Sequence, residues 1–110
     1  MSSPFQLKVY LQCMQHVPPL EPSDIQGALE ARARGDEWAR RLLEERFLPQ
    51  VLRWVQPYRG QGLSFEELIT AGNKALLRGL RQIKPGTPDA EDYLERCVAL
   101  EIESLIFARR

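Results

Sequence analysis

Apolar residues recur at the three-to-four-residue spacing of an α-helix in every long segment of the chain. No stretch alternates with the period of two that a half-buried strand needs. The pattern predicts five helices, of which the first covers Phe5 to Gln15 and ends before two prolines at positions 18 and 19. The second begins at Ser23, where Gln26 is expected to complete a capping box, and closes at Gly35. We therefore expect an all-helical fold.

The third predicted helix begins after Asp36, whose carboxylate can cap it, and Pro49 should bend or split it. Its apolar positions are numerous enough to form the central element of a core; they are Trp38, Leu42, Leu43, Phe47, Val51, Leu52 and Val55. A turn is predicted at residues 58–63, because two glycines there permit backbone angles that other residues resist.

The fourth predicted helix begins at Ser64, with Glu67 as its capping-box partner. Its core face should hold Phe65, Leu68, Ile69, Gly72, Leu76, Gly79, Leu80 and Ile83, and the two glycines would let another helix approach closely. The opposite face is polar and holds Glu67, Thr70, Asn73, Lys74, Arg78 and Arg81, with Leu77 among them. Leu77 is either an isolated exposed leucine or a contact residue, and the basic stripe is either solvated or a binding surface.

The last predicted helix follows a break at residues 84–87, with Thr87 as its cap and Pro88 in its first position, and runs almost to Arg110. Acidic residues in its first turn suit the positive end of the helix dipole. Its apolar stripe is regular and consists of Leu94, Val98, Ile102, Leu105 and Ile106, with Phe107 beside it near the end.

Length and charge set limits on what the protein does. A chain of 110 residues with 44% hydrophobic composition suits one domain. Its fifteen basic and fifteen acidic residues cancel, so the whole chain has no long-range field that would attract nucleic acid or an anionic membrane. No apolar run approaches the roughly 20 residues of a membrane span, and the N-terminus lacks a signal-peptide core, so we expect a cytoplasmic protein.

Reactive groups are few. Cys13 and Cys97 lie far apart without a metal-binding spacing, which indicates two ordinary thiols. His16 has no acid or nucleophile near it in sequence, so a surface or helix-end position is expected. No nucleophile-base pair, phosphate-binding loop or metal-ligand pattern is present. The sequence therefore predicts no cofactor, no metal and no enzymatic activity.

Three segments resemble one protein family in their order and spacing. The sequence LSFEELITAGNKALLRGL at Leu63 to Leu80 resembles the polymerase-binding helix in the second conserved region of housekeeping-type bacterial sigma factors. Residues 33–62 are similar to the helix and turn that precede this element. The pair Tyr10-Leu11, followed by residues 16–20, resembles the segment that family members carry just ahead of it. The similarity covers most of residues 4–81.

The resemblance implies a sigma-factor region-2-like helical bundle and a binding site. We expect a single domain over residues 1–110, with N-terminal helices at 1–35, a core-binding helix pair at 36–84 and an atypical C-terminal helix at 87–110. In such sigma factors the helix docks on a coiled coil of the beta-prime subunit of core RNA polymerase. The corresponding polar row here is Glu67, Thr70, Ala71 and Asn73, and Lys74 and Leu77 extend it. Thr70 and Ala71 replace the usual glutamine and glutamate, which implies weakened or retargeted docking.

The last helix departs from the family pattern. Active sigma factors use aromatic and basic residues at this place to open promoter DNA. Here Tyr93 matches one aromatic position, but Arg96 and Cys97 stand where the family usually has a tryptophan pair. Six carboxylates between Asp89 and Glu103 face a single cation, so this surface should repel phosphate. Tyr93 and Arg96 are thus only weak candidates for DNA contact, and Tyr93 is expected at the edge of the core.

Two functions follow as hypotheses. The first is a sigma-like transcription protein that binds core RNA polymerase, either as a split initiation factor working with a second sigma-like subunit or as a regulator that occupies the sigma site without melting DNA. Because the chain ends at Arg110 without a helix-turn-helix, we expect it not to be a complete initiator by itself. The second is a repurposed helical module, in which the docking face, Leu77 and Phe107 pair with another copy of the chain.

Overall fold

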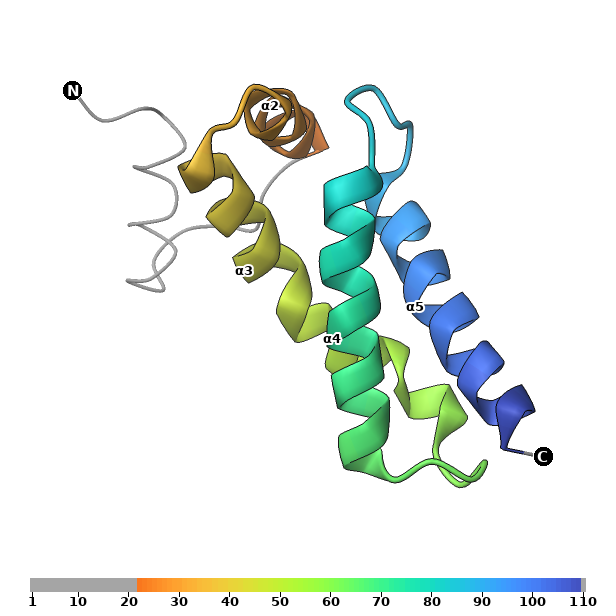
Figure 1. Cartoon of the computed structure of the whole chain (residues 1–110). Coiled ribbons are helices and arrows are strands. Elements are labelled where there is room, and N and C mark those ends of the chain that lie inside the picture. Colours follow the sequence, from red (N-terminus) through yellow and green to blue (C-terminus); the bar gives the residue numbers. More distant parts are fainter. Residues whose placement is uncertain (1–21, 110) are drawn as a thin grey trace. The chain divides into compact units, whose positions relative to one another are not determined.

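The computed structural model describes residues 22–109, except for the side chains of the first two of them. Four α-helices follow one another: α2 (Pro22–Ala33), α3 (Glu37–Trp54), α4 (Phe65–Gln82) and α5 (Ala90–Ala108), with a short 3-10 helix, η1 (Gln56–Tyr58), between α3 and α4 (Figure 1). No strand occurs within this range. The all-helical fold class is therefore confirmed. The helix predicted over Phe5 to Gln15 lies outside the described residues, as do Cys13 and His16.

The described residues group into two compact units. The first comprises the described residues up to Arg46 together with Lys84–Pro88, and the second comprises Phe47–Ile83 together with the chain from Asp89 onward. Helix α3 contributes its first turns to one unit and its last turns to the other. The organisation of residues 1–110 as a single domain stays a prediction.

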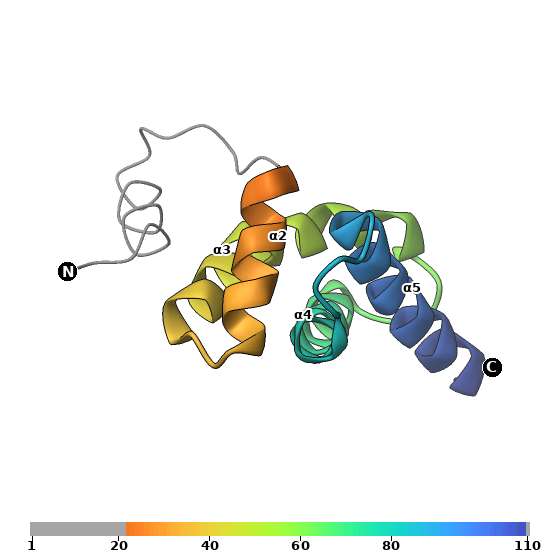
Figure 2. The ribbon, with the colours of Figure 1, turned by 90° about the horizontal axis from the view of Figure 1, so that it is seen from above.

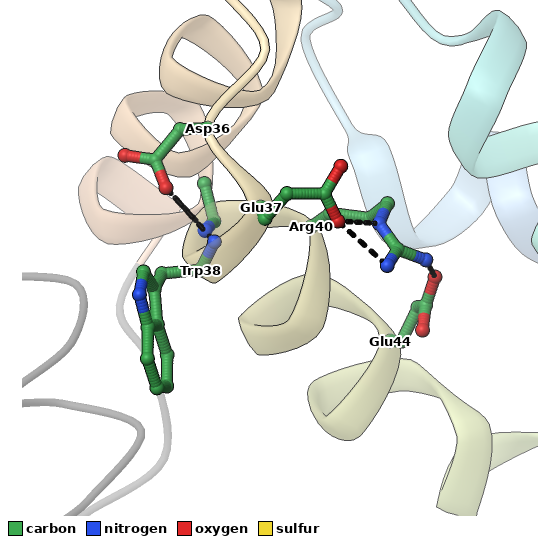
Figure 3. Close-up of polar contacts among 6 residues, drawn as sticks. Asp36, Glu37, Trp38, Arg40 and Glu44 are labelled. Carbon is green, nitrogen blue, oxygen red and sulfur yellow. Dashed lines mark hydrogen bonds and ion pairs between the residues drawn. The ribbon is translucent and has the colours of Figure 1, made fainter.

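In the first unit, α3 begins after Asp36, which is the predicted cap. The Asp36 carboxylate accepts hydrogen bonds from the backbone N–H groups of Trp38 at 2.9 Å and Ala39 at 3.1 Å (Figure 3). Gly35 takes a φ of 89°, which ends α2 and turns the chain toward α3 as predicted (Figure 2). Leu42 and Leu43 are fully buried, but Trp38 is 40% exposed, so its assignment to the core was wrong. As the second residue of α3, Trp38 lies in the first turn, beyond the buried stripe that begins at Ala39.

Gln26 holds the segment 84–88 against α2. Its side-chain amide donates to the carbonyl oxygen of Thr87 at 2.7 Å, and its carbonyl oxygen accepts from the N–H of Gly86 at 2.8 Å. Gly86 has a φ of 90°, so the position requires glycine. The predicted start of this helix at Ser23 was wrong, because Ser23 lies inside α2 and not at its N-cap, and the Gln26 amide binds Gly86 and Thr87. Helix α2 begins at Pro22.

The second unit is built on α4 and α5, which lie side by side in both views (Figures 1 and 2). Its core is apolar and consists of Phe47, Val51, Trp54, Val55, Leu63, Leu68, Ala71, Ala75, Leu76, Leu80, Ile83, Ala90, Leu94, Val98, Ile102 and Ile106. Three predicted core residues lie at the rim instead: Leu52 is 51% exposed, and Phe65 and Leu105 are also exposed. Leu52 is exposed because it projects about 100° around the helix from the buried Val51. The next buried side chain of α3 is that of Trp54.

Both helical glycines of α4 lie where another helix approaches closely. A Cβ atom on Gly79 would stand 3.1 Å from Leu94 Cδ2 and 3.2 Å from Cys97 Sγ, both on α5. Gly72 faces α3 and is still more crowded. The predicted role of these glycines as points of close helix packing is confirmed.

Three local predictions met different outcomes. The turn at residues 58–63 is confirmed, because Gly60 and Gly62 take φ values of 81° and 106°. Helix α3 runs through Pro49 without interruption, so the helix is not split there. The cap of α5 is Asp89, whose carboxylate accepts from Asp92 N–H at 3.0 Å, and not Thr87. The hydroxyl of Thr87 donates instead to the Lys84 carbonyl oxygen at 2.7 Å and closes the preceding turn.

Candidate functional site

The start of α4 presents Glu67, the first residue of the predicted polar row. The Ser64 hydroxyl accepts from the Glu67 N–H at 3.1 Å, and the Glu67 carboxylate accepts from the Ser64 N–H at 3.0 Å. The predicted capping box is thus complete. The hydrogen bond from the Ser64 backbone, followed by the bond from Arg109, holds the pKa of Glu67 below its ordinary value. Glu67 is therefore a carboxylate at neutral pH with a fixed orientation.

Arg109, at the C-terminal end of α5, binds the same carboxylate. Its Nη1 donates to Glu67 Oε1 at 3.2 Å, and its Nη2 pairs with Glu67 Oε2. Nη1 also lies 3.5 Å from the carbonyl oxygen of Gly62. A guanidinium that meets both oxygens of a carboxylate forms a directional fork, which fixes both side chains. The end of α5 is thereby joined to the first turn of α4.

A groove of about 450 Å³ runs between the first half of α4 and the last turns of α5. Its walls carry both charged and apolar side chains and consist of Leu63, Ser64, Glu66, Glu67, Thr70, Ala71, Lys74, Glu101, Leu105 and Arg109. Four of the six residues predicted to bind a partner meet here. Thr70 and Lys74 are exposed, Glu67 is half-buried, and Ala71 is buried at 7% exposure. Ala71 thus forms floor rather than rim, because α5 packs over that side of α4.

The charges of the groove are partly neutralised from within. Arg78 on α4 pairs with Glu101 on α5, as Arg109 does with Glu67. Within residues 22–109, no ion pair joins Lys74 or Glu66 to another side chain, and both are exposed on the wall of the groove. A ligand of this surface would therefore meet one free cation and one free carboxylate beside two paired carboxylates.

Asn73 and Leu77 are separated from the groove. Both are half-buried, and neither lines it. At 100° per residue they project from nearly the same side of α4 as Thr70 and Glu66, but further along the helix axis. Four residues of the predicted row therefore line the groove, and Asn73 and Leu77 continue the row beyond it.

The α5 contribution to the groove was not predicted from the sequence. Glu101, Leu105 and Arg109 follow one another at intervals of four residues, which places them on one face of α5. That spacing was visible in the sequence, but it did not indicate which helix the face would meet. Only the packing of α5 on α4 brings the three side chains to Glu67 and Lys74.

The two weak DNA candidates lie on α5 away from the groove. Tyr93 is half-buried, at the edge of the core. Arg96 is exposed and its Nε pairs with the Asp92 carboxylate at 3.1 Å. Cys97 directly follows Arg96 and is half-buried, and this burial raises the pKa of its thiol. Its thiolate is therefore disfavoured at neutral pH.

The part of the chain that the structure describes holds neither a candidate metal site nor a candidate membrane span. No three His, Cys, Asp or Glu side chains there come close enough together to hold a metal ion. None of the described helices combines the length and the apolar character that crossing a bilayer requires.

Comparison with known proteins gives independent evidence about the family. The chain is 34% identical over 85 residues to the RNA polymerase sigma-K factor of Bacillus subtilis, and this match covers 76% of the chain. The chain carries a sigma-factor-like region. It spans 29% of the length of sigma-K. No protein-family model matches the sequence. The similarity to sigma-K supports the sigma-factor resemblance at this level, and the housekeeping type and the truncation stay predictions.

Proposed function

We propose that this sigma-factor-like chain is a cytoplasmic, non-enzymatic protein that binds bacterial core RNA polymerase and takes part in or regulates transcription initiation. The observation that carries the proposal is the groove at the start of α4, where Glu67, Thr70, Ala71 and Lys74 gather. The similarity to sigma-K supports it, since that protein is named as an RNA polymerase factor. The beta-prime coiled coil is the proposed docking partner.

The groove has the chemistry of a modest protein-binding surface. Ala71 and Leu105 supply apolar area, while Lys74 and Glu66 supply unpaired charges of opposite sign at the wall. A helical partner with apolar and charged side chains in alternate turns would satisfy both. Asn73 and Leu77 would form a second contact further along α4, with an amide able to donate and accept.

We further propose that the chain has weak or no DNA-melting activity of its own. On α5 the exposed surface is acidic, and its cation Arg96 is already paired with Asp92. Cations that would hold phosphate are thus largely neutralised, so a role as a docking regulator is favoured over that of an initiator. A second sigma-like subunit would have to supply promoter contacts if the chain acts in initiation.

Binding to purified core RNA polymerase tests the proposal. Lys74→Glu and Thr70→Arg change exposed side chains of the groove, and we expect each to weaken binding by about tenfold, the effect of losing one central interface contact. Lys84→Glu makes the same charge reversal as Lys74→Glu on an exposed lysine in the loop before α5, and it should leave the affinity unchanged. Thermal melts would show that all variants remain folded.

Absence of binding by the unaltered chain at micromolar concentration would contradict the proposal. In that case a repurposed homodimerisation module becomes the better reading. One observation favours it specifically: Leu100 and Phe107 are 67% and 79% exposed and lie seven residues apart on one side of α5. A concentration-dependent increase in molecular mass, lost in Phe107→Ser, would support self-association.

A further inference from the structure

The carboxylate at the centre of the proposed docking groove is occupied by the protein itself. Glu67 Oε1 accepts from the Ser64 N–H and from Arg109 Nη1, and Glu67 Oε2 pairs with Arg109 Nη2. Of these partners, the Ser64 N–H belongs to the start of α4 and stays in place as long as the helix does. Arg109 lies 42 positions further along the chain than Glu67, so its contact depends on where the end of α5 lies.

Arg109 holds Glu67 in the way that a binding partner would. A guanidinium fork is the strongest common recognition of a carboxylate by a protein side chain. A partner that recognises both oxygens of Glu67 through a cationic side chain must therefore take the place of Arg109. The Ser64 N–H and Arg109 already use three of the roughly four acceptor positions of this carboxylate, so a second guanidinium cannot form the same two-pronged contact until Arg109 leaves.

The pair is exposed enough to exchange. The Arg109 side chain is 54% exposed and that of Glu67 is 40% exposed, so water can solvate each group when the other leaves. Exposed ion pairs contribute little net stability, and opening this one leaves neither charge buried. Arg109 is also the C-cap residue that directly follows α5, and its backbone N–H bonds only to carbonyl oxygens of the final turn. Its side chain can therefore swing away without unfolding α5.

We propose that Arg109 is a built-in competitor at this site, an autoinhibitory clasp that a cationic side chain of the partner displaces from Glu67. The inference rests on the proposed function, because it assigns a regulation to the same groove. The contact of Arg109 with Glu67 makes docking of the partner weaker than the groove alone would allow. It also makes docking dependent on anything that draws the end of α5 away, such as a second ligand that binds its exposed Phe107.

The test uses the full chain and purified core RNA polymerase at low ionic strength. Arg109→Gln removes the cation but keeps a polar side chain, and we expect up to about fivefold tighter binding, the range available from an exposed ion pair. Arg109→Lys keeps the charge without the fork and should give a smaller gain. Arg96→Gln is the matched control, because Arg96 is an exposed, paired arginine on α5 that does not line the groove.

Nuclear magnetic resonance titration of the Glu67 carboxyl group gives a readout that does not depend on polymerase. In Arg109→Gln the pKa of Glu67 should rise toward its ordinary value, while the Ser64 bond keeps it somewhat lowered. An unchanged Glu67 pKa would show that the clasp does not form in solution.

The binding outcomes separate the two proposals. If the unaltered chain binds polymerase but Arg109→Gln binds equally or less tightly, the clasp is refuted and the docking function stands. If neither the unaltered chain nor any variant binds, the docking function fails and the clasp fails with it.

Discussion

Gly72 on α4 lies directly against Val51 on α3, so closely that a Cβ atom on Gly72 would stand 2.6 Å from Val51 Cγ1. The same atom would be 3.1 Å from Val55 Cγ1. Valine has one strongly preferred side-chain rotamer in a helix, so neither methyl group can move aside at low cost. The last turns of α3 and the middle of α4 are thus in a contact that glycine permits and alanine does not.

Gly72→Ala should destabilise the protein, although alanine is the better helix former by about 1 kcal/mol. Forcing an extra methyl group into a packed core costs about 1 to 3 kcal/mol, which outweighs the gain in helix propensity. Urea unfolding would measure the free energy change. Gly79→Ala is the matched control and should cost less, because its nearest atoms are 3.1 Å and 3.2 Å away at Leu94 Cδ2 and Cys97 Sγ, in side chains that adjust more easily.

A double substitution assigns the cause. Val51→Ala removes the methyl group in the way, so it should be less destabilising beside Gly72→Ala than alone. Additive effects of the two changes would show that the clash with Val51 is not what makes glycine necessary at position 72.

Most of the helices could be predicted because their signals are local. The spacing of apolar residues, Asp36 before α3 and the Ser64 and Glu67 pair before α4 each act within a few residues of the chain. The start of α5 was misplaced by two residues for a physical reason of the same local kind: Thr87 and Asp89 are both good caps. The sequence could not show that Gln26 would bind Gly86 and Thr87 and hold that turn outside the helix.

The position of this cap can be checked by substitution. Asp89→Ala removes the acceptor for Asp92 N–H and should cost about 1 kcal/mol of stability, as loss of a helix cap usually does. Thr87→Ala loses one exposed hydroxyl bond to Lys84 and should cost less. Chemical denaturation of both variants gives the comparison. A larger loss for Thr87→Ala would restore the cap that the sequence first indicated.

The site was harder to predict than the helices, because half of it depends on packing. Glu67, Thr70, Ala71 and Lys74 were found from their places on α4 and from the family resemblance. Their surroundings depend on α5, whose residues lie about 30 to 40 positions further along the chain. A helical wheel can show which residues share a face, but it cannot show which other face will cover them. For that reason neither the burial of Ala71 nor the ion pair of Glu67 with Arg109 was expected.

The lowered pKa of Glu67 makes stability depend on pH in a defined direction. A carboxylate whose folded pKa lies below the unfolded value contributes stability above the unfolded pKa, here ordinarily 4.5, and loses it as the pH falls through the folded pKa. Glu67→Gln keeps a capping box but cannot titrate. The stability advantage of the unaltered protein over Glu67→Gln should therefore be constant above about pH 6 and shrink steadily below about pH 5.

Denaturant unfolding at a series of pH values measures this difference. Glu66→Gln, one residue earlier and exposed, serves as the control for a general loss of negative charge. A stability difference between the unaltered protein and Glu67→Gln that stays the same from neutral to acid pH would contradict the assignment of a lowered pKa to Glu67.

The surface of α5 leads to a prediction about DNA. Arg96 is paired with Asp92 at 3.1 Å, and Glu95 is an exposed carboxylate beside them. Since phosphate binding requires unpaired cations, a promoter-like single strand should show no binding to the unaltered chain in fluorescence anisotropy at micromolar protein.

Combining Asp92→Asn, which frees Arg96, with Glu95→Lys should create binding that weakens as salt is added. Glu30→Lys on α2 raises the net charge at an exposed position outside α5 and should create less. Tight, salt-dependent binding by the unaltered chain would mean that Tyr93 or another surface recognises DNA despite these carboxylates, and would return the protein to the class of initiators.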